Sequence, residues 1–215
     1  MLYSHLERTL LHPAVTIDEQ FAALEEAIRL GFAGLTAAPF WIKKWRRELG
    51  EQHPLALTAV IGYPFGYQRT EAKQLEAELA LKDGASELEM VVNTSAVFSA
   101  SSGWVKVEIA KLVTLAHAHE TPLTVVLETS LLPDEWTRKL VKTAADAGAD
   151  FLKNGTGALE TTFSIEKAMA FRQLVPASVG VKVLGDGATN SEMKQLVEAG
   201  IDRICVSRFA PIDVD

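Results

Sequence analysis

The sequence has few of the features that mark secreted or membrane proteins. It holds one cysteine in 215 residues, which excludes an internal disulfide framework. No apolar stretch approaches the roughly 20 residues that a membrane-spanning helix needs. The N-terminus, MLYSHLERTLLHP, lacks the charged start and apolar run of a signal peptide. We therefore expect a soluble, cytoplasmic protein with no membrane partner.

The charges form no block of one sign. The formal net charge of -7 is spread over alternating acidic and basic residues, which disfavours nucleic acid as a partner and favours a small metabolite. The chain also has no linker or low-complexity tract. With 215 residues and 48% hydrophobic content it can bury one sizeable core, so we expect a single domain over residues 1–215.

The sequence does contain a repeated join between helix and strand. An amphipathic helical segment ends at a glycine, and a short apolar strand follows at once. The join reads LGFAGLTAA from Leu30, DGASELEMVVN from Asp83, AGADFLKNGTG from Ala147 and AGIDRICVSR from Ala199. Each glycine stands where a residue in the left-handed backbone conformation commonly ends a helix. These glycines are Gly31, Gly84, Gly148 and Gly200.

Further strands bring the count to about eight, alternating with helices. We expect them at Leu6–Leu11, Leu57–Tyr63, Leu123–Thr129 and Val179–Leu184. This alternation predicts a single (β/α)₈ TIM barrel, and a doubly wound sheet is the competing architecture. Only residues 209–215 follow the last strand, so the last helix is expected to be short or absent.

Local signals support the helices. Two capping-box spellings predict helix starts, at Thr16 to Glu19 and at Thr189 to Glu192. A further start is expected at Pro133. The expected buried faces are Phe21, Leu24 and Ile28 in one helix, and Trp136, Leu140 and Ala144 in another.

The fifth residue after each capping glycine has a common register. These residues are Thr36, Glu89, Lys153 and Cys205, and their neighbours along the strand are mostly apolar. If the apolar neighbours pack outward on the helices, the fifth positions point into the barrel near its C-terminal mouth, where barrel enzymes keep their active sites. Lys153 and Glu89 then face one cavity, and Cys205 is interpreted as a small core residue instead of a nucleophile.

The same parity places a second lysine inside the barrel. In VGVKVLG, Lys182 points inward, and in TVVLETS, Glu128 does so. Two buried lysines need an explanation because an unpaired buried charge is costly. One is structural, with ion pairs between Lys153 and Glu89 and between Lys182 and Glu128. The other is a reactive amine, in which a nearby cation favours the neutral form of Lys153.

These segments resemble the deoxyribose-phosphate aldolase family. FLKNGTG is similar to its Schiff-base segment, VGVKVLG to its second lysine strand, and ELEMVVN to its Glu-Ile-Asp-Met-Val strand. Similar segments continue in RTLLHP, in IGYPFG with TEAKQLEAE, and in VVLETSLLPDEW, so the resemblance spans nearly the whole chain. Six motifs in the family's order are specific, whereas one alone would be weak.

The resemblance implies roles for three residues. Lys153 resembles the lysine that forms an imine, Lys182 the cation that lowers its pKa, and Glu89 stands where the family has a proton-relaying aspartate. The implied reaction is reversible cleavage of 2-deoxyribose 5-phosphate to acetaldehyde and glyceraldehyde 3-phosphate. It needs no metal or other cofactor. His117 and His119 lie two residues apart on a predicted helix and cannot share an ion.

The chain departs from the family at two carboxylates. Glu89, and Glu7 in the first strand, stand where the family has aspartates. Each change adds a methylene, and a misplacement of about 1 Å can cost on the order of 10²-fold in rate, so the site is either reshaped or damaged. Glu7 is expected to contact substrate; alternatively it is a solvated or ion-paired terminal residue.

The expected phosphate site departs further. The family holds phosphate with backbone amides of a Gly-Gly turn and a Gly-x-Ser-Ser segment; here these read Gly185-Asp186 and Cys205-Val206-Ser207-Arg208. An aspartate that faces phosphate is repulsive. Arg208 either contacts phosphate itself or neutralises Asp186 as a surface pair. The expected substrate-binding residues are Glu7, Thr156, Gly157, Gly185, Ser207 and Arg208.

Three functions follow from these patterns. The first is a class I aldolase acting on a deoxyribose phosphate, and the second is the same imine chemistry on an unphosphorylated or different aldehyde. The third is a non-catalytic barrel that serves as a binding or assembly protein. A homo-oligomer is possible, since Trp41, Trp45 and Trp104 fit either helix packing or a subunit interface.

Overall fold

The computed structural model describes residues 2–99, 102–159 and 161–208. Eight parallel strands close into a barrel in the order of the chain, with β1 hydrogen-bonded to β8. The strands are β1 (Leu6–Leu10), β2 (Gly34–Ala37), β3 (Ala56–Ile61), β4 (Glu87–Val91), β5 (Leu123–Val126), β6 (Phe151–Lys153), β7 (Gly180–Leu184) and β8 (Arg203–Val206). The predicted barrel is therefore confirmed, and the doubly wound alternative is wrong.

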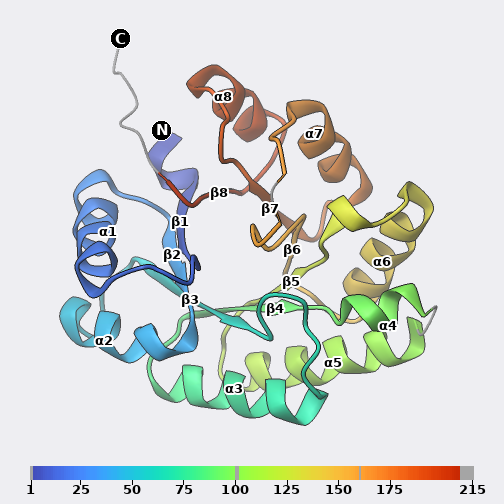
Figure 1. Ribbon diagram of the computed structural model, residues 1–215, viewed down its shortest axis with the longest axis horizontal. Helices are drawn as coiled ribbons and strands as arrows, with labels where there is room; N and C mark the ends of the chain where they lie inside the picture. The colour runs from blue at the N-terminus through green and yellow to red at the C-terminus, as the bar shows by residue number, and fades with distance from the viewer. Residues whose placement is uncertain (1, 100–101, 160, 209–215) are drawn as a thin grey trace.

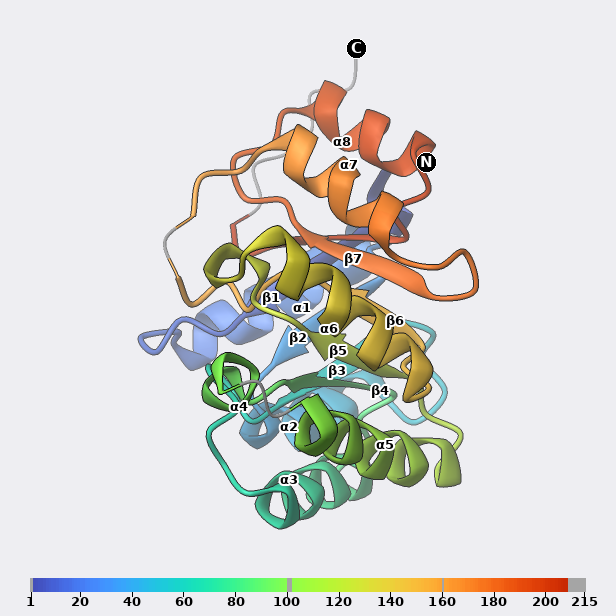
Figure 2. The same cartoon turned by 90° about the vertical axis from the view of Figure 1, so that its right-hand side faces the viewer.

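Helices surround the strands in a ring (Figure 1). They are α1 (Ile17–Leu30), α2 (Pro39–Leu49), α3 (Thr70–Lys82), α4 (Thr94–Phe98), α5 (Ser102–Ala118), α6 (Asp134–Asp146), α7 (Ile165–Leu174) and α8 (Asn190–Glu198). Two short 3₁₀ helices complete the set, η1 (Leu2–His5) and η2 (Thr129–Leu131). Seen from the side, the strands cross the middle of the molecule with helices on both sides (Figure 2).

The four predicted joins have the expected geometry. Gly31, Gly84, Gly148 and Gly200 all have positive φ, between 73° and 98°. Both capping boxes are formed, one at Thr16 before α1 and one at Thr189 before α8. Local chemistry in the sequence therefore sets where each of these helices begins and ends.

Three strands end earlier than predicted, and β1 does so by a single residue, at Leu10. β3 stops at Ile61 because Gly62 adopts a φ of 73° and opens a turn. β5 stops at Val126, since Glu128 has a φ of 49° and precedes η2. The alternation of inward and outward side chains therefore does not extend to Glu128.

The helix faces were predicted only in part. In α1, Leu24 is buried, but Ile28 is 45% exposed, so its assignment to the core is wrong. The face of α1 that meets the barrel is made instead by Gln20, Ala23, Leu24 and Ala27. In α6, which begins after Pro133 as predicted, Leu140 and Ala144 are buried. Trp136 is half-buried, and its ring lies against Phe98 of α4, with centroids 5.8 Å apart.

The apolar core lies between the barrel and its helices. Outward strand residues such as Leu88, Val181 and Ile204 are completely buried there. Within the parts of the chain that are described, no helix is long and apolar enough to cross a membrane. The prediction that the last helix is short or absent concerns residues 209–215, which lie outside the described residues.

Candidate active site

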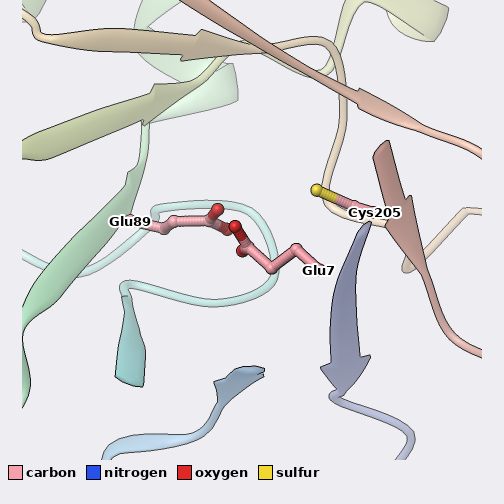
Figure 3. A group of neighbouring side chains, drawn as sticks. All are labelled: Glu7, Glu89 and Cys205. Atoms are coloured by element: carbon pink, nitrogen blue, oxygen red, sulfur yellow. The ribbon is translucent and has the colours of Figure 1, made fainter. Parts of the chain in front are cut away.

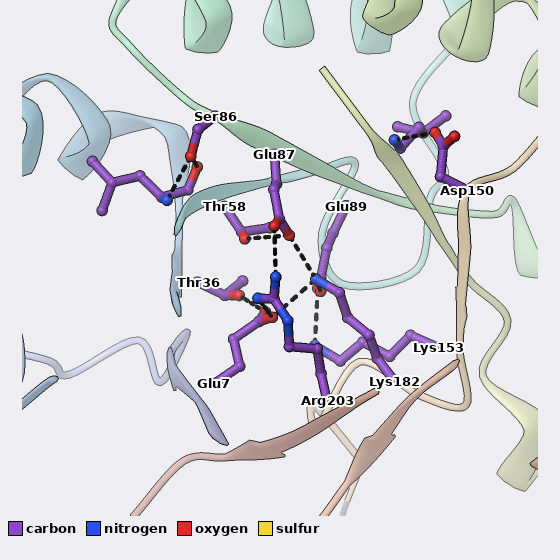
Figure 4. Close-up of polar contacts among 12 residues, drawn as sticks. Glu7, Thr36, Thr58, Ser86, Glu87, Glu89, Asp150, Lys153, Lys182 and Arg203 are labelled. Carbon is purple, nitrogen blue, oxygen red and sulfur yellow. Dashed lines mark hydrogen bonds and ion pairs between the residues drawn. The ribbon is translucent and has the colours of Figure 1, made fainter. Parts of the chain in front are cut away.

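Lys153 ends β6 and points into the barrel. It pairs in register with Val126 of β5 on one side and Lys182 of β7 on the other. Its side chain is 1% exposed, and its Nζ donates to Glu89 Oε2 at 2.8 Å. Lys153 and Glu89 therefore share one site, as their common register predicted (Figure 4).

Lys182 is surrounded by carboxylates. Its Nζ donates to Glu7 Oε2 at 2.9 Å and to Glu87 Oε2 and Glu89 Oε1, both at 3.1 Å. The three protons of this ammonium group are thus all engaged. Glu89 uses one carboxylate oxygen for each lysine, so it bridges Lys153 and Lys182.

The predicted ion pair between Lys182 and Glu128 is wrong. Glu128 lies beyond the end of β5, in left-handed backbone. Its Oε2 accepts the Thr156 backbone N–H at 3.0 Å and also a hydrogen bond from the Thr156 hydroxyl. Its Oε1 accepts from the Ser130 hydroxyl at 3.0 Å. Glu128 therefore organises the loop after β6 and does not neutralise a barrel lysine.

Glu7 is an interior residue of the barrel. Its side chain is completely buried, so the alternative of a solvated residue is wrong. Besides Lys182, Glu7 Oε2 accepts from Arg203 Nη1 at 3.1 Å, and Glu7 Oε1 accepts from the Thr36 hydroxyl. Glu7 is thus the ion-paired residue that the sequence left as an alternative.

Two charged residues of the interior were missed. Arg203 donates to Glu7 and, through Nη2, to Glu87 Oε1 at 2.8 Å. Glu87 and Arg203 lie two residues before Glu89 and Cys205 on their strands, so they share the same inward parity. Applying the register rule to the third residue after each capping glycine, as well as to the fifth, would have found both.

Ion pairing keeps the buried side chains Lys182 and Glu7 in their charged forms. Burial lowers the pKa of Lys182, but Glu7, Glu89 and Glu87 raise it further, and the result lies well above its usual value. Burial raises the pKa of Glu7, while Lys182, Lys153 and Arg203 outweigh this and bring it far below its usual value. The described interior thus pairs three carboxylates with three cations, Lys153, Lys182 and Arg203.

The expectation of a depressed pKa for Lys153 is not met. Burial lowers this pKa and Lys182 lowers it further, but Cys205, Glu89 and Glu7 raise it above the usual value. Burial raises the pKa of the Cys205 thiol to about 12, so the thiol is neutral near pH 7. Lys182 therefore acts in the expected direction but is outweighed.

One group of possible metal ligands lies inside the barrel. Glu7, Glu89 and Cys205 have ligand atoms within 4.8 Å of one another, and no other such group occurs in the described ranges (Figure 3). Lys182 Nζ already lies between the two carboxylates, within 3.1 Å of an oxygen of each. An internal ammonium group thus occupies the position between the two carboxylates, and a metal ion would have to displace it.

The loops after β6, β7 and β8 meet at the mouth of the barrel. Thr156 is buried, and Gly157 lies beside Leu184 at the end of β7. The Gly185 backbone N–H donates to the Cys205 carbonyl at 2.8 Å. The structure therefore brings the five predicted loop residues to one end of the barrel, where the Thr156 and Gly185 amides are already engaged.

Ser207 and Arg208 present backbone amides to a carboxylate of the chain itself. The Ser207 N–H donates to Asp186 Oδ1 at 2.7 Å and the Arg208 N–H to the same oxygen at 3.3 Å. Among the described residues, no ion pair joins the Arg208 guanidinium to Asp186. Arg208 thus contacts Asp186 through its backbone N–H and not as the surface ion pair that was one of the two alternatives.

An apolar wall lies beside Lys153. Val60, Val91 and Val126 form a small buried cluster inside the barrel, separate from the main core, with Leu11 and Tyr63 packed against it. Val60 is the register partner of Glu89, and Val126 is that of Lys153. Burial raises the pKa of Tyr63, and so does the charge of Glu128, whereas Lys153 opposes the shift. The Lys153–Glu89 pair therefore has apolar walls on one side.

A lysine bonded to a carboxylate at the C-terminal mouth of a parallel barrel is an arrangement suited to carbonyl chemistry. A family model described as DeoC/LacD family aldolase matches residues 12–204. The chain belongs to this family of aldolases, which are lyases.

Relatives cover nearly the whole chain. The deoxyribose-phosphate aldolase of Thermococcus kodakarensis is 34% identical over 204 residues, 94% of this chain and 91% of that protein. The Bacillus mycoides deoxyribose-phosphate aldolase is 33% identical over 207 residues, 96% of this chain and 92% of that protein. A deoxyribose phosphate aldolase from Aeropyrum pernix, described as a unique tetrameric structure, superposes with a TM-score of 0.86 at 30% identity, covering 96% and 86% of the two chains.

Proposed function

We propose that the protein is a class I aldolase that forms an imine on Lys153. Its reaction is the reversible cleavage of a 2-deoxy aldose to acetaldehyde and a second aldehyde. The relatives' name indicates 2-deoxyribose 5-phosphate, which yields glyceraldehyde 3-phosphate as the second aldehyde. The observation that carries the proposal is the 2.8 Å contact between Lys153 Nζ and Glu89 Oε2 inside the barrel mouth.

Glu89 is the proton acceptor in the first step. It takes a proton from the Lys153 ammonium, and the neutral amine attacks the aldehyde carbon of the sugar. Glu89 returns this proton to the hydroxyl of the carbinolamine, so that water leaves, a protonated imine remains and Glu89 is again a carboxylate. Glu89 then accepts the proton of the 3-hydroxyl as the C2–C3 bond breaks. The second aldehyde departs, and the electron pair of the broken bond remains in an enamine on Lys153.

The same groups complete the cycle. Protonation of the enamine at C2 restores an imine, and addition of water releases acetaldehyde and the free lysine. Lys182 acts as a positioning residue in this scheme. It holds one oxygen of Glu89 at 3.1 Å, so that the other oxygen faces Lys153.

Borohydride trapping tests the proposal. Incubation with acetaldehyde followed by reduction is expected to give an N-ethyl group on Lys153, identified by peptide mass analysis. Lys153→Arg is the matched variant, because it keeps the interior charge but cannot form an imine. It is expected to lose the adduct and on the order of 10³-fold or more in cleavage rate. An unmodified Lys153 in the native protein would contradict the proposal.

A non-catalytic barrel is the second candidate. The observation that favours it is the complete pairing of Lys182 with three carboxylates, which is also how a purely structural network would look. The two candidates differ in the native protein, which should give the adduct and cleave the sugar only if it is an aldolase. A structural barrel would show neither adduct nor cleavage in the native form or in Lys153→Arg, and both forms would unfold as single cooperative units.

A further inference from the structure

The ends of β7 and β8 hold two backbone donors and one internal anion. The Ser207 and Arg208 amides converge on Asp186 Oδ1, at 2.7 and 3.3 Å. Two N–H groups that converge on one oxygen are an arrangement that binds anions. In this chain the anion they hold is the carboxylate of Asp186, from the loop between β7 and α8.

Arg8 adds a cation to this place. Arg8 pairs in register with Val206, the residue before Ser207. Its Nε and Nη1 atoms are buried and have no hydrogen-bond partner among the described residues. Burial lowers the pKa of Arg8, and the charges of Glu26 and Asp186 oppose the shift. Asp186 is thus one of two acidic residues that counteract the effect of burial on the half-buried Arg8 guanidinium.

Lys153 and the Asp186 contact lie at the same end of the barrel. Lys153 Nζ donates to Glu89 at 2.8 Å, and the Cys205 sulfur lies within 4.8 Å of a Glu89 carboxylate oxygen. Ser207 follows Cys205 by two residues, or about 7 Å along extended backbone. A short carbon chain that begins at Lys153 and points out of the mouth covers a span of this order. Asp186 is therefore placed to meet the far end of the second aldehyde.

We infer that Asp186 sets the substrate class: the second aldehyde carries a neutral, hydroxylated end and no phosphate. This inference rests on the imine chemistry proposed above. A phosphate group would meet the Asp186 charge, and the two amides it would need are already engaged. A hydroxyl group can instead donate to Asp186 Oδ2, to which no hydrogen bond is seen within the described part of the chain.

Electrostatic repulsion by Asp186 discriminates between a phosphorylated and a hydroxylated end of the substrate. Like charges brought together at a binding surface disfavour binding, and at an exposed carboxylate such as Asp186 we expect about 10- to 100-fold in preference, which is about 1.4 to 2.7 kcal/mol. Asp186→Gly removes the carboxylate and frees both amides. Asp186→Asn removes the charge but keeps an oxygen on the amides. Comparing the two variants thus separates the effect of the Asp186 charge from the effect of an oxygen that occupies the two amides.

The experiment compares kcat/KM for 2-deoxyribose and 2-deoxyribose 5-phosphate. The native protein is expected to prefer the unphosphorylated sugar, and Asp186→Gly to shift the ratio roughly 10- to 100-fold toward the phosphate. Asp186→Asn is expected to shift it less. Inorganic phosphate should inhibit cleavage of deoxyribose by Asp186→Gly but not by the native protein. Asp146→Asn is the matched control: Asp146 is a partly exposed carboxylate on α6 paired with Lys142, so its neutralisation should leave the ratio unchanged.

Trapping on Lys153 keeps the two proposals separable. If acetaldehyde is trapped on Lys153 but the native protein prefers the phosphorylated sugar, the inference on Asp186 is overturned and the aldolase proposal stands. An unchanged ratio in Asp186→Gly, with the adduct still formed, overturns the inference in the same way. If no adduct forms in any variant, the aldolase proposal itself has failed.

Discussion

At the scale of single residues, the protonation of Lys153 controls its reactivity. Burial and Lys182 lower its pKa, but Cys205, Glu89 and Glu7 raise it above the ordinary 10.5. Because only the neutral amine attacks a carbonyl, the initial rate of adduct formation should increase with pH, by up to about tenfold per unit. The increase should continue past 10.5, where an ordinary lysine would level off.

Adduct yields from short incubations at a series of pH values, each quenched with borohydride, measure this dependence. Glu89→Gln removes one of the carboxylates that raise the pKa, so it should move the increase to lower pH. A rate that levels off below pH 10.5 in the native protein would show that the carboxylates do not control this amine.

The sequence predicted some of these residues and missed others for a clear reason. The alternation of side chains along a strand brought Lys153 and Glu89 together, because both lie within regular strands. It failed for Glu128, which lies beyond β5 in left-handed backbone. The engagement of Asp186 with the Ser207 amide joins two loops, and such a contact depends on the closed barrel.

At the scale of elements, the N-terminus of α8 depends on Thr189. Its hydroxyl accepts the Glu192 N–H at 3.2 Å, and Glu192 Oε2 accepts the Thr189 N–H at 2.8 Å. Thr189→Ala should therefore lower the free energy of unfolding by about 0.5–2 kcal/mol. Urea denaturation measures the change, with Thr189→Ser as the control that keeps the hydroxyl. Equal losses in both variants would contradict the capping role.

Elements were predictable where their signals are local. The capping boxes and the four C-cap glycines lie within a few residues of the backbone groups that they satisfy, so the sequence alone locates them. Ile28 was placed wrongly because its exposure depends on how α1 rolls against the barrel, where small residues such as Ala23 and Ala27 make the contact. Helix rotation is set by packing and not by the helix itself.

At the scale of the whole molecule, the interior charges help to close the barrel. Glu7 on β1 binds Lys182 on β7 and Arg203 on β8, so ion pairs join the first strand to the last two, whereas the sheet joins it to β8 alone. From across the barrel, Glu87 on β4 binds both of these cations, and Glu89 on β4 binds Lys182. Neutralising any one member leaves buried charge without a partner, which is strongly destabilising.

Stability should therefore depend on pH in both directions. The pKa of Glu7 is lowered in the folded protein, so its contribution is present above the unfolded value of about 4.3 and is lost as pH falls toward the folded value. The pKa of Lys182 is raised, so its contribution is present below about 10.4 and is lost as pH rises toward the folded value. Each group changes the free energy of unfolding by at most about 1.4 kcal/mol per pH unit.

Urea denaturation at intervals across the pH range tests this balance. The free energy of unfolding should be nearly constant between about pH 5 and pH 9 and should decrease on either side. Lys182→Met should unfold more easily at neutral pH and show a shallower alkaline decrease, because the group that loses its proton is gone. Lys142→Met is the matched control: Lys142 is 76% exposed in its pair with Asp146, so its removal should leave the alkaline decrease intact. An alkaline decrease of equal slope in both variants would show that the buried lysines do not set this limit of stability.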